Sequence, residues 1–191
     1  MPKIADIELT PNPNARKFVL REPLTYGVAR SYESAESAQG DPLAAALFAI
    51  PHVVSVFYVD TWLTVTQDGE ADWNELARQV AVPIREAPGA AERTSDLLAG
   101  AMPDVQVTPR EELSADTLQK LEMIESVLDQ QVRPYLRNDG GDLHVLGIEG
   151  NVVKVHYQGA CGSCPSSLSG TLSAIEYMVR EIDPELEVMP V

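Results

Sequence analysis

The sequence predicts an α+β protein made of two small domains joined by a flexible linker. In both halves, short apolar stretches with β-branched residues alternate with segments of helical periodicity. Between them, residues 89–115 contain glycine and several prolines and show no sustained periodicity. A loop of that length is unusual inside one compact domain. We therefore expect domains at residues 1–88 and 116–191, with residues 89–115 as the linker.

The first domain is expected to follow the order β-β-α-β-β-α. Asp41 can cap a helix that has Pro42 at its first position, and the last helix begins near Asp72. Short helices and strands in this order predict helices on one face of an antiparallel sheet. Four stretches have strand character: residues 4–9, 17–20, 53–59 and 62–66.

The second domain is expected to follow the order α-β-β-α-β. Apolar residues at helical spacing from Leu118 to Leu136 predict one long amphipathic helix, bent at Pro134. A second helix is expected from Pro165 to about Ile182. The expected strands are residues 143–148, residues 152–157 and an edge strand within 186–191.

The only two cysteines, Cys161 and Cys164, are separated by two residues. They lie in a glycine-containing turn between a predicted strand and a predicted helix, and the loop is expected to expose both thiols. Pro165 suits the first helical position, which puts Cys164 near the N-cap. The free N–H groups and positive dipole of a helix start favour a thiolate. Thiolates bind metals and clusters and take part in disulfide exchange.

Three kinds of chemistry fit such a pair. An iron–sulfur cluster ordinarily has four thiolate ligands, so two chains related by a twofold axis would share one. Zinc across a dimer is an alternative, with His144 and His156 as further candidates, although both histidines are expected to face solvent. A thiol–disulfide oxidoreductase is less favoured, because residues 165–191 are too few to complete a thioredoxin-like domain.

Composition narrows the function further. The net charge is −15 and no basic patch is visible, which disfavours nucleic acid and anionic membranes as partners. The N-terminus lacks signal- and transit-peptide features, and no apolar run approaches the roughly 18 residues of a membrane span. We expect a cytoplasmic protein, or a mitochondrial matrix protein only if a targeting segment is missing from this chain. No catalytic triad, phosphate loop or metal-hydrolase motif is present, so we expect no enzyme.

The first half resembles the N-terminal domain of the Nfu family of iron–sulfur proteins. The resemblance rests on four segments: Thr-Pro-Asn-Pro-Asn-Ala-Arg-Lys-Phe at 10–18, Pro-Leu-Ala at 42–44, residues 53–57, and Leu-Thr-Val-Thr at 63–66. Two positions depart from the family pattern. His52 stands where a glycine commonly precedes the strand, and Val59 stands where a turn glycine is usual.

The second half resembles the NifU-type C-terminal domain of Nfu proteins. Three segments carry this resemblance: Val-Arg-Pro-Tyr-Leu at 132–136, Asn-Asp-Gly-Gly-Asp at 138–142, and Gly-Ala-Cys-Gly-Ser-Cys-Pro-Ser-Ser at 159–167. The resemblance implies an iron–sulfur cluster carrier with Cys161 and Cys164 as cluster ligands. It favours a [4Fe–4S] cluster over [2Fe–2S], a homodimer when the cluster is bound, an upstream cluster donor, and apo iron–sulfur proteins as clients. A scaffold that builds clusters de novo is the alternative.

Other residues near these segments have simpler expected roles. Asp139 and Asp142 flank glycines and are expected to shape a turn near the cysteine loop. Tyr135 and Tyr157 are expected to pack in the core.

Overall fold

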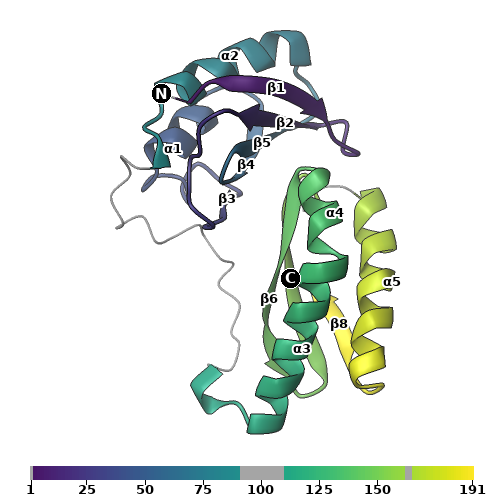
Figure 1. Cartoon of the computed structure of the whole chain (residues 1–191). Helices are drawn as coiled ribbons and strands as arrows, with labels where there is room; N and C mark the ends of the chain where they lie inside the picture. Colours follow the sequence, from purple (N-terminus) through teal and green to yellow (C-terminus); the bar gives the residue numbers. More distant parts are fainter. Residues whose placement is uncertain (1, 91–109, 162–164) are drawn as a thin grey trace. The chain divides into compact units, whose positions relative to one another are not determined.

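A computed structural model of the chain describes residues 2–90, 110–161 and 165–191. The chain divides into two compact units, Met1–Met102 and Pro103–Val191. Both units combine helices with a sheet, which confirms the predicted α+β class with two domains (Figure 1). Most of the predicted linker falls on residues 91–109, outside the described residues, so the boundaries 89–115 stay a prediction.

The first unit holds a five-stranded antiparallel sheet in the order β1-β2-β5-β4-β3. Helices α1 and α2 pack against it (Figure 1). Asp41 caps α1 as predicted, because its carboxylate accepts the N–H groups of Leu43 and Ala44. The elements are β1 (Ile4–Leu9), β2 (Ala15–Leu20), β3 (Arg30–Tyr32), α1 (Pro42–Phe48), β4 (Val53–Val59), β5 (Trp62–Gln67) and α2 (Trp73–Glu86).

The predicted order β-β-α-β-β-α lacks strand β3 and was wrong on this point. The strand pairs with β4, with Arg30 opposite Tyr58 and Tyr32 opposite Val56. Its three residues are all buried. So short a segment with no alternation of apolar and polar residues leaves no strand signal in the sequence.

The second unit holds a three-stranded sheet in which β7 pairs antiparallel with β6 and parallel with β8. Helices α3, α4 and α5 lie on one face of this sheet (Figure 1). The elements are a 3-10 turn η2 (Arg110–Glu112), α3 (Ala115–Gln131), α4 (Arg133–Asn138), β6 (Gly141–Glu149), β7 (Val152–Gly159), α5 (Pro165–Ile182) and β8 (Glu187–Pro190). This unit has its own apolar core between helices and sheet.

The predicted single bent helix is two helices that meet at Val132, so the order α-β-β-α-β was also wrong here. Pro134 lies in the first turn of α4. A proline inside a continuous helix would remove one backbone hydrogen bond and press its ring on the carbonyl of Gln130. The break two residues earlier avoids both costs. It also leaves Tyr135 73 % exposed, so the expected packing role of that residue was wrong.

Candidate functional site

The site lies where β7 ends and the cysteine segment begins. Gly159, the last residue of β7, has a φ of 68°, a conformation that glycine adopts without strain. It lies opposite Gly141 in the sheet. The next residue, Ala160, donates its N–H to the carbonyl of Gly140 at 3.1 Å. The two glycine-containing segments of the sequence are therefore neighbours in the fold.

The side chain of Cys161 is only 3 % exposed and belongs to the apolar core of the second unit. The expectation of two exposed thiols was wrong for this residue. Strand β7 ends at Gly159, two residues before Cys161, and α5 begins at Pro165 as predicted. Cys164 lies outside the described residues, so the assignment of Cys161 and Cys164 as ligands stays a prediction.

Gly141 forms one wall around the Cys161 thiol. A Cβ atom at position 141 would lie 2.6 Å from the Sγ of Cys161 and 2.7 Å from the carbonyl oxygen of Gln158. Real Cβ atoms essentially never approach that closely. The second glycine of the Gly-Gly pair is therefore required by contact with the cysteine and its strand. The sequence showed the pair, but its partner is visible only in the fold.

Arginines from α4 hold the residue that follows Gly141. The buried carboxylate of Asp142 accepts a hydrogen bond from Nε of Arg137 at 3.0 Å, and Nε of Arg133 lies 3.8 Å from its other oxygen. Arg133 also donates to the carbonyl of Leu143 at 3.0 Å. These bonds fix the start of β6 against α4, and they keep Gly141 beside Cys161. Asp142 thus lies in β6 and holds the start of that strand against α4, whereas the sequence predicted only a role in shaping the turn.

Tyr157 lies four residues before Cys161 and shares the same core. Its side chain is 4 % exposed, which confirms the expected packing role. The hydroxyl oxygen is buried and has no hydrogen-bond partner in the part of the chain that the structure describes. Burial, with smaller contributions from Cys161 and Glu176, raises the pKa of Tyr157 to about 12. Sequence reasoning did not assign this hydroxyl a role at the site.

The two histidines of this unit do not join the cysteine. His144 and His156 are directly opposite each other on β6 and β7. Alternation along β7 places His156 on the face opposite Tyr157. The side chain of His156 is buried, with Nδ1 2.9 Å from the carbonyl oxygen of Val191, and burial lowers the pKa of the half-buried His144. The expectation of a solvent-facing side chain was wrong for the buried His156, whereas His144 is partly exposed. Neither is placed as a second ligand with Cys161.

Comparison with known proteins supplies the family. The model of the domain described as "Scaffold protein Nfu/NifU N terminal" matches residues 4–88, and the model of the NifU-like domain matches residues 124–189. A human protein named "NFU1 iron-sulfur cluster scaffold homolog, mitochondrial" is 34% identical over 93% of this chain and 67% of its own length. The chain belongs to the Nfu family. This confirms the resemblance seen in the sequence.

Other Nfu relatives agree with this assignment. The protein of the same name from Drosophila ananassae is 32% identical over 93% of this chain and 60% of its own. "NifU-like protein 4, mitochondrial" from Arabidopsis thaliana is 30% identical over 93% of this chain and 62% of its own. The chain thus spans 60% to 67% of the length of these relatives. Within residues 2–90, 110–161 and 165–191, no helix has both the length and the apolar character needed to cross a membrane.

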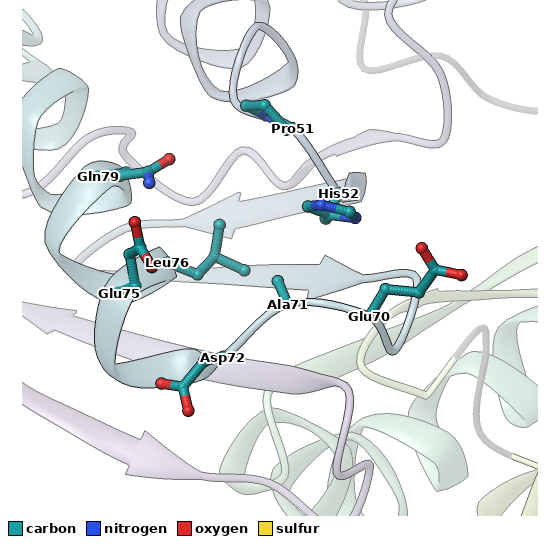
Figure 2. Close-up of a pocket in the computed structure, with 8 residues that line it drawn as sticks. All are labelled: Pro51, His52, Glu70, Ala71, Asp72, Glu75, Leu76 and Gln79. Carbon is teal, nitrogen blue, oxygen red and sulfur yellow. The ribbon is translucent and has the colours of Figure 1, made fainter.

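The Nfu N-terminal unit carries a separate polar pocket of about 310 Å³ beside the start of α2 (Figure 2). His52 lies at its edge with a φ of 73°, a left-handed backbone conformation that is uncommon for residues other than glycine. Its Nδ1 lies 2.9 Å from Oδ2 of Asp68, and Glu70 lies close to both. All three side chains are exposed. This contact links the start of β4 to the turn after β5.

Proposed function

We propose that this Nfu protein is an iron–sulfur cluster carrier. Two chains bind one [4Fe–4S] cluster through Cys161 and Cys164 of each chain and pass it to apo iron–sulfur proteins. The observation that carries the proposal is the position of Cys161. Its side chain lies in the core of the second unit against Gly141, in the segment that contains both cysteines. Family membership and the printed names of the relatives support it. The cluster is cargo in this proposal, and a [2Fe–2S] cluster is the alternative cargo.

Transfer proceeds by ligand exchange without a change of oxidation state. A thiolate of the client bonds to an iron atom, the iron–sulfur bond to Cys161 or Cys164 breaks, and the released thiolate takes up a proton. Because Cys161 is buried, loading requires local opening around its thiol. The cost of that opening weakens cluster binding, which suits a carrier that must release its cargo. Acting this way, the protein is a carrier and donates no catalytic group to a reaction.

A scaffold that assembles clusters from iron and sulfide is the second candidate. The names of the relatives favour it, because they describe a cluster scaffold. The two functions differ in rate. A carrier passes on a preformed cluster faster than it builds one, whereas a scaffold builds clusters at a rate that matches their transfer.

The partners and compartment follow from the same proposal. A cluster donor supplies the carrier, clients with free cysteines receive the cluster, and the second chain completes the ligand set. The proposed compartment is the cytoplasm, and the mitochondrial names of relatives make the matrix the alternative. Fractionation of cells that express the protein from its own locus distinguishes them.

Anaerobic reconstitution tests the proposal. We expect about four iron and four sulfide per dimer, broad absorbance near ~400 nm, and a dimer that forms only with the cluster. Cys161→Ala and Cys164→Ala should each abolish cluster uptake and leave the far-UV circular dichroism unchanged. Uptake of a full cluster by the folded Cys161→Ala protein would overturn the ligand assignment. A monomer that binds no iron but reduces disulfides would instead favour the oxidoreductase.

A further inference from the structure

The hydroxyl of Tyr157 differs from other buried tyrosine hydroxyls in this chain. Tyr32 and Tyr58, both fully buried in the first unit, donate their hydroxyls to the carboxylate of Asp41. Tyr157 is also buried, yet no described residue accepts a hydrogen bond from it. Leaving a buried hydroxyl unpaired is unfavourable relative to pairing it. A phenylalanine would fill this position more cheaply in the apoprotein.

The surroundings of this hydroxyl point to the ligand sulfur. Tyr157 and Cys161 belong to one packed core cluster and are four residues apart along the chain. A tyrosine phenol is protonated at physiological pH, so this hydroxyl can donate a hydrogen bond. The group it lacks is an acceptor.

A cluster-bound thiolate is such an acceptor. It carries negative charge, and hydrogen bonds to charged groups are stronger than those between neutral groups. Hydrogen bonds to the sulfurs of iron–sulfur clusters also tune their reduction potentials. In the apoprotein the thiol of Cys161 offers only a weak acceptor. The donor would therefore gain its partner when the cluster is loaded.

We propose that the Tyr157 hydroxyl donates a hydrogen bond to the cluster-bound sulfur of Cys161 and thereby slows release of the cluster. This rests on the proposed carrier function, with Cys161 as a ligand. Tyr157 is a positioning residue that acts through Cys161. In the apoprotein the hydroxyl is unpaired, which is unfavourable, and in the loaded protein it gains an acceptor. The residue therefore favours retention of the cluster over its release.

The test compares Tyr157→Phe with Tyr177→Phe in the full chain. Tyr177 lies on α5 of the same unit and is 66 % exposed, so its variant removes the same atom from a solvated position. Three properties are measured: thermal stability of the apoprotein, the rate at which a chelator removes iron anaerobically, and the reduction potential of the cluster. For Tyr157→Phe we expect release on the order of tenfold faster, a more negative potential, and apoprotein stability equal to or above wild type. Tyr177→Phe should match wild type in all three.

The opposite outcomes are distinct. If Tyr157→Phe loads a cluster and releases it at the wild-type rate, the inference fails while the carrier function stands. If the variant lowers apoprotein stability, the hydroxyl already has a partner there, such as Glu176, and the inference also fails. If wild-type protein takes up no cluster at all, the carrier function itself fails and the inference fails with it.

Discussion

At the scale of single residues, the site depends on the absence of a side chain at Gly141 as much as on the thiol of Cys161. Gly141 packs so closely on Cys161 and the carbonyl of Gln158 that no Cβ fits between them. Both neighbours are held in place, the carbonyl by the β6–β7 pairing and the thiol by the core. A side chain at position 141 can therefore be accommodated only if the sheet or the cysteine moves.

We predict that Gly141→Ala destabilises the second unit by about 1–3 kcal/mol, the usual cost of overpacking, and reduces cluster retention. Urea unfolding of the apoprotein and anaerobic chelator release measure the two effects. Gly170→Ala is the control, because a Cβ there meets nothing within 4 Å. In the middle of α5 it should stabilise the helix by about 0.5–1 kcal/mol. Unchanged stability of Gly141→Ala would show that the backbone yields easily at this point.

Residue patterns in the sequence revealed some of these features and hid others. Pro165 marked the start of α5 correctly, whereas the predicted cysteine loop falls on residues 162–164, outside the described residues. The burial of Cys161 was hidden, because it depends on Gly141, 20 residues earlier in the chain, and on the helices that close the core. The bond between His52 and Asp68 was also hidden, because it depends on β5 lying next to β4.

At the scale of elements, periodicity predicted most helices and strands because their apolar faces are long enough to show a period. Strand β1 has the predicted bounds Ile4–Leu9, and β4 has the predicted bounds Val53–Val59. Strand β3 was not predicted, because three residues are too few to show a period. The break between α3 and α4 was not predicted either, because the apolar spacing continues across it. Only the backbone chemistry of Pro134 distinguishes a bend from a break.

Lys120 links two of these helices. Its ammonium group lies 2.8 Å from Asp116 within α3 and 2.9 Å from Asp183, directly after α5. The hydrogen bond from Lys120, followed by that from the backbone of Glu185, lowers the pKa of Asp183 below its ordinary 3.8. Hydrogen bonds to both carboxylates raise the pKa of Lys120. The contact joins the start of α3 to the end of α5.

We predict that Lys120→Met lowers the melting temperature slightly near pH 7 and that this difference disappears in acid. A carboxyl whose pKa is lowered by folding stabilises the fold above its unfolded pKa, and this contribution is lost as the pH falls through the folded pKa. The difference should therefore persist above pH 3.8 and fade as the pH falls further, through the lowered pKa of Asp183. Asp116→Asn is the control, since it leaves the link to Asp183 intact. A difference that stays constant down to pH 2 would assign the effect to packing instead.

At the scale of the whole molecule, the two units have separate apolar cores. The core of the first unit is built from residues between Phe18 and Ala87, and that of the second from residues between Leu121 and Val188. The first is organised around Asp41, which caps α1 at 3.0 Å to Leu43 and Ala44 and also accepts the hydroxyls of Tyr32 and Tyr58. The second contains the cysteine site. Stability and cluster binding should therefore be separable by mutation.

We predict that Asp41→Ala destabilises the first unit by about 2–4 kcal/mol, because it removes the helix cap and the carboxylate that accepts the hydroxyls of Tyr32 and Tyr58. Iron and sulfide per dimer should stay at the wild-type value, because Cys161 and its neighbours belong to the other core. Asp41→Asn, which can still accept the N–H groups of α1, should destabilise the first unit less.

Gly141→Ala should show the reverse pattern, with impaired cluster retention and an unchanged unfolding transition of the first unit. Calorimetry with iron analysis on the same samples measures both. Loss of cluster binding in Asp41→Ala would show that the cluster site depends on the N-terminal unit, so that the two units are energetically coupled.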